Sequence, residues 1–271
     1  GTGKTTIIRA IVRLGELHSL KIALAAPTGR AAKRLGEATG REAQTLHRLL
    51  EYRFATEAAE VSRRPKFHLN AQNPLEVDWL IIDESSMLDT FLLRAIVRAI
   101  PDGARLLLVG DVDQLPSVGP GDVLRDLIAS QRIPVVRLTQ VFRQAQQSHI
   151  VLNAHRIHQG EIPHVPVYAQ GTTGDFYFIE ASHPERVQEK LLHVVLDRIP
   201  KAFSYTVDGG LQVLAPMHKG VVGCSMLNRV IQERCHQGAH TLRRNSQMWK
   251  VGDKVMQTTN NYEKEVFNGD I

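Results

Sequence analysis

The chain has 271 residues, of which 43% are hydrophobic, and its formal net charge is +5. This length allows one large domain or two of ordinary size. No apolar run approaches the ~20 residues of a membrane-spanning helix, and the two cysteines, Cys224 and Cys235, fit no disulfide framework. The composition therefore argues against a membrane protein or a disulfide-stapled secreted domain. It favours a reducing compartment, and the positive charge suits a polyanionic partner.

The first residues, GTGKTT, match the end of the phosphate-binding loop G-x-x-x-x-G-K-[ST]. In that motif backbone N–H groups surround the phosphates, the lysine reaches the β- and γ-phosphates, and the hydroxyl holds Mg²⁺. The nucleotide-binding candidates are Gly1, Thr2, Gly3, Lys4, Thr5 and Thr6. The alternative is a plain glycine-rich helix start. Because the motif's first glycine would precede residue 1, we expect a chain cut inside its phosphate loop.

Short apolar runs then alternate with helical patterns. Strands are predicted at 21–27, 79–83, 104–110 and 135–138, with helices between them. Such alternation predicts an α/β fold with a doubly wound parallel sheet, whose ligands bind at the carboxyl ends of the strands. The polar stretch 52–76 interrupts the pattern and is interpreted as an inserted excursion with a small hairpin.

A second alternating unit is predicted from residue 147, giving domains at 1–146 and 147–271. Its expected helices are 147–158, 184–198 and 223–236, and its expected strands are 176–180, 211–216 and 253–258. Asn268-Gly269 is typical of a hairpin turn, and its second strand would follow the last residue. We therefore expect the chain to be truncated at both ends.

Two carboxylates follow the apolar strand WLII. Asp83 is placed to hold Mg²⁺, and Glu84 can orient and polarise an attacking water. The alternative is a pair of acids that offsets the dipole of a following helix. Together with the phosphate loop, the pair indicates nucleotide hydrolysis.

Two further residues follow later strands. Gln114, in GDVDQLPSVGPG, would project an amide toward the γ-phosphate, although the segment can also be read as a loop that only turns the chain. Arg143, in LTQVFRQ, would reach the transferred phosphoryl group from across a cleft, a role worth ~10³–10⁵ in rate. Its alternative is an ordinary surface arginine.

Candidates for contacts to the phosphates of a polyanion lie at strand ends and helix starts. Pro27, Thr28, Gly29 and Arg30 follow a strand and open a helix, so backbone N–H groups and the guanidinium can hold a phosphate. His47 can bond a phosphate or only pack, and Lys219 can contact a phosphate or be an ordinary loop lysine. Lys33 and Arg34 are interpreted as a solvated helix face. Because aromatics make up only 6% of the chain, we expect backbone contacts without sequence preference.

The ordered motifs resemble those of superfamily 1 DNA helicases. These are GTGKTT, APTGRAAKRL, TLHRLL, DESSML, GDVDQLPSVGPGDVLRD and LTQVFRQ. More narrowly, VLAPMHKGVVG and GDKVMQTTNNYEKEVFNGDI resemble the stand-alone RecD-like ATP-dependent DNA helicases of bacteria, over nearly the whole chain. Ser85 departs from the alanine or valine usual in the family, and 52–76 matches it least.

The resemblance implies a P-loop NTPase motor of two RecA-like lobes with parallel sheets, which uses ATP and Mg²⁺. It implies 5′-to-3′ movement on single-stranded DNA, unwinding at single-strand/duplex junctions, roles in DNA repair and recombination, and a bacterial cytoplasmic, nucleoid-associated location. By position, the catalytic residues are Lys4, Asp83, Glu84, Gln114 and Arg143, the metal ligands are Thr5 and Asp83, and the DNA contacts are Pro27, Thr28, Gly29, Arg30, Thr45, His47 and Lys219. Flanking parts of the family pattern are absent, so the isolated chain is expected to be inactive.

Three alternatives stay open at this point. The chain can be the helicase part of a conjugative relaxase, or a DNA-binding ATP switch that does not unwind. A zinc site is also conceivable from His218, Cys224, Cys235, His236 and His240. The spacing lacks a C-x₂₋₄-C pair, and buried core thiols are the better interpretation.

Overall fold

The computed structural model describes residues 3–53, 66–139, 148–168, 173–207, 209–244, 247–259 and the single positions 261, 264, 266, 268 and 270. The chain divides into two compact units. The first comprises Gly1–His164 and Gln257–Asp270, and the second comprises Val165–Met256 and Ile271. The division into lobes at residues 146 and 147 stays a prediction.

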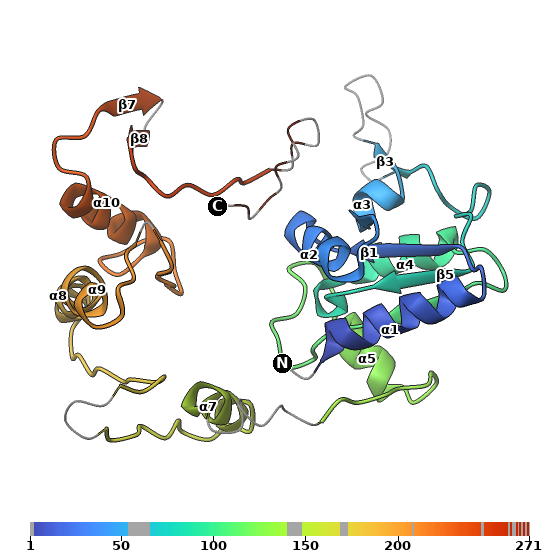
Figure 1. Ribbon diagram of the computed structural model, residues 1–271, viewed down its shortest axis with the longest axis horizontal. Coiled ribbons are helices and arrows are strands. Elements are labelled where there is room, and N and C mark those ends of the chain that lie inside the picture. Colours follow the sequence, from blue (N-terminus) through green and yellow to red (C-terminus); the bar gives the residue numbers. More distant parts are fainter. Residues whose placement is uncertain are drawn as a thin grey trace. The chain divides into compact units, whose positions relative to one another are not determined.

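The first unit is built on a parallel sheet of four strands in the order β2-β1-β5-β6. Figure 1 labels β1 and β5 of this sheet. These strands are β1 (Ile22–Ala26), β2 (Ala43–Thr45), β5 (Trp79–Ile82) and β6 (Arg105–Leu108). Leu24 pairs with Ile81, which in turn pairs with Leu107, so apolar side chains fill the middle of the sheet. The parallel α/β architecture predicted from the alternating pattern is confirmed.

Helices cover both faces of this sheet because strand residues alternate between the faces. Leu24 and Ile81 point to the face covered by α1 (Lys4–Leu17) and α2 (Gly29–Thr39). Ala25, Leu80 and Ile82 point to the opposite face, which packs against α3 (Leu46–Leu49), α4 (Thr90–Ala99) and α5 (Val123–Ala129). The unit also contains the 3₁₀ turn η1 (Ser85–Met87) and α7 (His149–His158). In Figure 1, α1 and α4 lie on opposite sides of the sheet.

The polar stretch departs from the alternation as predicted. Its flanks form an antiparallel pair, β3 (Tyr52–Arg53) with β4 (Lys66–Phe67), in which Tyr52 lies opposite Phe67. Residues 54–65 are outside the described part of the chain. The expected strand at 135–138 is wrong, because these residues have no regular structure. A strand needs a hydrogen-bonded neighbour, and the described residues provide none there.

The second unit is mainly helical in the part that the structure describes. It contains α8 (Pro184–His193), the π turn η2 (Val194–Arg198), α9 (Ile199–Phe203) and α10 (Cys224–Cys235). An antiparallel hairpin of β7 (Thr241–Arg244) and β8 (Gln247–Lys250) follows, which the sequence analysis did not predict. No helix among the described residues is long and apolar enough to cross a membrane.

The expected strands at 176–180, 211–216 and 253–258 are also wrong. The described residues of these segments are irregular, and Tyr177, Phe178 and Leu214 are exposed. An apolar run forms a strand only where neighbouring strands pair with its backbone, and its composition does not guarantee such neighbours. The turn predicted at Asn268-Gly269 lies partly outside the described residues.

Candidate nucleotide and nucleic-acid site

A left-handed glycine precedes α1, where the sequence predicts the end of a phosphate loop. Gly3 adopts a left-handed conformation (φ 87°), and its carbonyl accepts the first helical hydrogen bond from the N–H of Ile7 at 3.1 Å. A residue with a Cβ is strained at this φ, which explains the glycine before Lys4. The side chain of Lys4 is half-buried, whereas Thr5 and Thr6 are exposed. Gly1 and Thr2 lie outside the described residues.

The two predicted carboxylates lie where β5 ends. The N–H of Asp83 bonds to the carbonyl of Ala25 at 3.0 Å, which continues the parallel pairing one residue past the strand. The chain then turns sharply, because Glu84 is left-handed (φ 51°) and begins η1. The fully buried Ser85 holds the turn: its N–H bonds to the carbonyl of Val109 and its hydroxyl to that of Ile82, each at 2.9 Å.

The loop after β6 comes close to this turn. A Cβ on Gly110 would lie 2.7 Å from a methyl of Leu124 and 3.0 Å from the backbone nitrogen of Ser86, so only glycine allows the approach. Further along, Thr90 at the start of α4 donates from both its N–H and its hydroxyl to the carbonyl of Pro120, each at 2.9 Å. The loop that carries Gln114 is therefore anchored at both ends.

One residue of this loop was missed by the sequence analysis. Oδ2 of Asp111 lies 3.7 Å from Nζ of Lys4 and accepts a 3.3 Å hydrogen bond from Nε2 of Gln114. It thus links the lysine of the predicted phosphate loop to the predicted sensor amide. The signal was available in the sequence, because Asp111 follows the strand-ending glycine in GDVDQ.

A cavity of about 480 Å³ brings the predicted groups together. Its polar lining comes from the phosphate loop, the start of α2 and the ends of β5 and β6: Thr5, Thr28, Arg30, Arg34, Asp83, Glu84 and Gln114. The remaining lining is Ala31, Leu35, Ala38 and Met87. Carboxyl ends of parallel strands meet at one edge of a sheet, which explains the convergence. Arg34, expected on a solvated helix face, lines this cavity as well.

The predicted DNA contacts near α2 lie at that helix's N-terminus. Thr28 caps α2, because its hydroxyl accepts a 3.2 Å hydrogen bond from the N–H of Ala31. Pro27 is half-buried and Gly29 is buried, whereas Arg30 is exposed beside the cavity. The exposed guanidinium and the helix N-terminus together favour an anion at this position.

Thr45 and His47 lie on the short helix α3 and its cap. Thr45 is buried, and its hydroxyl accepts a 3.2 Å hydrogen bond from the N–H of Arg48. The ring of His47 packs edge-on to Tyr52 at 5.5 Å and lies 6.0 Å from Phe67. Partial burial lowers the pKa of His47 below its ordinary value, and the charge of Asp89 partly opposes this. Packing and a phosphate contact are compatible at His47, because the residue stays exposed.

Two predicted site residues remain. Arg143 is outside the described residues. Lys219, in the second unit, is exposed on a loop that folds over the start of α10, where the N–H of Cys224 bonds to the carbonyl of Met217 at 3.0 Å. A Cβ on Gly223 would lie 2.4 Å from the carbonyl oxygen of Lys219, so glycine is required for this fold of the loop.

The donor set suits Mg²⁺ and a nucleotide. Mg²⁺ prefers oxygen ligands and takes only one or two carboxylates from a protein when phosphates complete its shell. The hydroxyl of Thr5 and the carboxylate of Asp83 line the same cavity and are oxygen donors of this kind. Among the described residues no group of three or more His, Cys, Asp or Glu side chains is placed to hold a metal ion.

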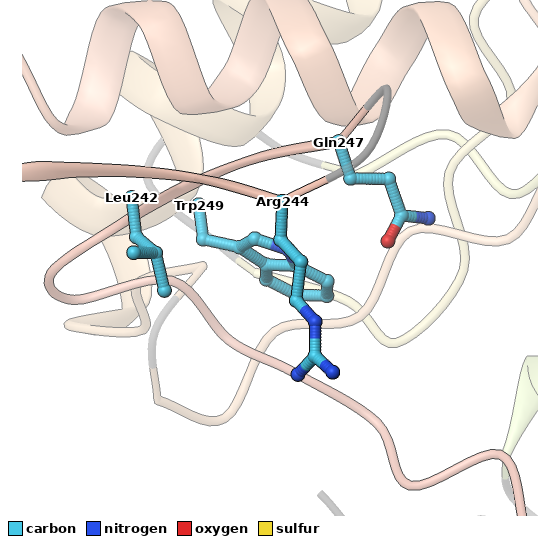
Figure 2. Close-up of a pocket in the computed structure, with 4 residues that line it drawn as sticks. All are labelled: Leu242, Arg244, Gln247 and Trp249. Atoms are coloured by element: carbon cyan, nitrogen blue, oxygen red, sulfur yellow. The ribbon is translucent and has the colours of Figure 1, made fainter.

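A second pocket, of about 470 Å³, lies on the hairpin of the second unit (Figure 2). It is lined by Leu242, Arg244, Gln247 and Trp249. Leu242 pairs with Trp249 and Arg244 with Gln247, so all of these side chains project from one face of β7 and β8.

Comparison with known sequences supports a nucleotide-binding domain in the first part of the chain. Residues 1–173 match the family described as AAA domain, and residues 227–271 match the SH3 domain of ATP-dependent RecD-like DNA helicases. The whole chain is 38% identical to the ATP-dependent RecD2 DNA helicase of Deinococcus radiodurans and 31% identical to the RecBCD enzyme subunit RecD of Mycolicibacterium smegmatis. It spans 34% of the first relative and 52% of the second.

Solved structures of a Bacteroides Pif1 helicase are more distant. The structure bound to single-stranded DNA is 24% identical, with a TM-score of 0.39 over 60% of this chain and 41% of that one. A double mutant is 23% identical, with a TM-score of 0.44 over 99% of this chain and 62% of that one. These scores are too low to carry weight beside the sequence matches. From the match over residues 1–173 and the motifs gathered around the cavity, the chain belongs to the AAA-domain family of P-loop proteins.

Proposed function

We propose that the protein is the motor core of an ATP-dependent DNA helicase. The observation that carries the proposal is the cavity in the first unit, which gathers a phosphate-loop hydroxyl, two carboxylates, an amide and the capped N-terminus of α2. Nucleotide hydrolysis needs the hydroxyl, the carboxylates and the amide. A contact between the N-terminus of α2 and a polyanion, at the same edge of the sheet, would couple hydrolysis to DNA. The names of the sequence relatives agree with this assignment.

The residues divide the work of hydrolysis. Lys4 would bind the β- and γ-phosphates, while Thr5 and Asp83 would hold Mg²⁺, which supplies charge neutralisation on the phosphates when bound. Glu84 would accept the proton of the attacking water, and Gln114 would report the presence of the γ-phosphate. Arg143 would contact the phosphoryl group from the interface of the two lobes.

Single-stranded DNA is the proposed track. Residues 27–30, together with Thr45 and His47, would contact its phosphates on the first lobe, and Lys219 on the second. Most of these contacts use backbone or hydroxyl groups, which supports binding without sequence preference. We further propose 5′-to-3′ movement, action at single-strand/duplex junctions in repair and recombination, and work on DNA in the bacterial cytoplasm.

The test is ATP hydrolysis by the full-length protein with and without single-stranded DNA, beside Glu84→Gln and the matched control Glu37→Gln. Glu37 is exposed on α2 and does not line the cavity. DNA should stimulate the wild type and the control, and Glu84→Gln should lose hydrolysis while still binding DNA. Unwinding of a duplex with a 5′ tail, and not one with a 3′ tail, would establish the direction. Hydrolysis indifferent to DNA would replace this proposal with that of a nucleotide switch.

A further inference from the structure

Asp111 contacts two residues of the proposed site, but the proposed function gives it no role. Its two carboxylate oxygens are engaged differently. Oδ1 accepts a 3.2 Å hydrogen bond from the N–H of Asp113 and shapes the turn. Oδ2 faces the ammonium of Lys4 at 3.7 Å and the amide of Gln114 at 3.3 Å. The second oxygen therefore joins the two side chains expected to recognise the phosphates.

This contact competes with nucleotide binding. Lys4 carries a single positive charge, and Asp111 and the β- and γ-phosphates compete for interaction with it. A triphosphate carries more negative charge than one carboxylate, so it draws Lys4 away. The carboxylate of Asp111 then loses its cation and lies near an anion, and like charges repel. Movement of Asp111 would also move Gln114, because their side chains share a hydrogen bond and their backbones form one turn, with the N–H of Gln114 3.2 Å from the carbonyl of Asp111.

We propose that Asp111 is a positioning residue that holds Lys4 and Gln114 together before ATP binds and is displaced from Lys4 by ATP. This inference rests on the proposed function of the same site. It assigns to Asp111 the step by which binding at the phosphate loop reaches the amide of Gln114. The cost is a lower ATP affinity in the resting protein.

The matched control lies in the same loop. Asp113 has the same charge and similar exposure, but its Oδ1 pairs with Nε2 of His158 at 3.0 Å instead of with Lys4. Asp111→Asn and Asp113→Asn therefore remove the same charge from neighbouring positions. A general electrostatic effect on a bound polyanion would appear in both variants, whereas release of Lys4 would appear only in the first.

The experiment measures the dissociation constant of a fluorescent ATP analogue with Mg²⁺, without DNA, for the full-length wild type and both variants. We expect Asp111→Asn to bind about 2- to 5-fold more tightly, as for removal of a competing, partly exposed ion pair. Its KM should fall without a rise in kcat, and Asp113→Asn should match the wild type. A folding defect weakens binding, so a gain in affinity cannot come from misfolding.

Unchanged or weaker binding in Asp111→Asn, or equal tightening in both variants, would overturn the inference while leaving the proposed function standing. A wild-type protein that binds no ATP would overturn both.

Discussion

The backbone N–H of Glu84 donates a 2.9 Å hydrogen bond to Oδ1 of Asp83, and Glu84 itself is held in the left-handed region at φ 51°. The proposed metal ligand thus fixes the peptide of the proposed catalytic base. The conformation is unfavourable for any residue with a Cβ, and the surrounding hydrogen bonds of Ser85 sustain it. Backbone strain is therefore stored at the residue proposed as the catalytic base.

This strain predicts a difference between two inactive variants. Glu84→Ala and Glu84→Gly both lack the carboxylate, so both should lose hydrolysis. Glycine adopts a left-handed conformation without the Cβ penalty, and the glycine variant should be more stable by about 1 kcal/mol. Urea unfolding of both variants measures the difference. Equal unfolding midpoints would show that Glu84 is not strained.

The close approach at the end of β6 predicts that Gly110→Ala is destabilising. The added methyl would meet Leu124 at 2.7 Å and the backbone nitrogen of Ser86 at 3.0 Å, and the backbone atom cannot move away cheaply. Overpacking of this kind costs about 1–3 kcal/mol. The control is Gly209→Ala, where the nearest atom is 3.8 Å from the new Cβ. Thermal unfolding should separate the two, and a neutral Gly110→Ala would contradict the packing described.

His47 predicts a pH dependence of stability. Because burial lowers its pKa in the folded state below the ordinary 6.5, the unfolded chain binds more protons than the folded one. The folded state is therefore penalised as the pH falls below 6.5 toward the folded-state pKa, and the penalty is absent above 6.5. His47→Gln should lose this part of the acid sensitivity. The free energy of unfolding of wild type and variant, measured from pH 7.5 to 5, makes the comparison, and parallel curves would refute the assignment.

We predict that Arg34 contributes to nucleotide turnover and that its neighbour Lys33 does not. It lines the cavity with Asp83 and Glu84, and among the described residues it has no ion-pair partner, so its charge is available to a bound anion. A charge-assisted hydrogen bond contributes about 1.5–3 kcal/mol, so Arg34→Ala should lower kcat/KM for ATP by about tenfold or more. Lys33→Ala, exposed on the same helix and not lining the cavity, is the control. Equal kcat/KM values for the two variants would show that Arg34 makes no contact with the nucleotide.

Much of the first unit follows from local sequence. Unbroken apolar runs such as WLII can satisfy both faces of a parallel sheet, and helical periodicity between the strands predicted helices such as α4. Since parallel strands share one carboxyl edge, the positions of Asp83, Glu84 and Gln114 after two strands were enough to predict that they meet. These patterns are local, and the parallel sheet brings the residues that follow its strands together at one edge.

The errors have one cause. The runs at 135–138 and 176–180 are as apolar as true strands, but a strand exists only when another strand pairs with it. The hairpin β7–β8 shows the converse, because a polar, basic segment becomes a strand where a partner lies beside it. Pairing partners are a property of the assembled chain and leave no mark on the segment itself.

By itself the sequence determined the phosphate-loop motif, the carboxylates after β5, the parallel sheet of the first unit and the resemblance to RecD-like helicases, because each depends on residue type and spacing along the chain. Only the tertiary structure decided that Arg34 faces the cavity, that Glu84 is strained, and that Asp111 lies between Lys4 and Gln114. Those relationships join residues from separate elements, and their distances are set by how helices and strands pack.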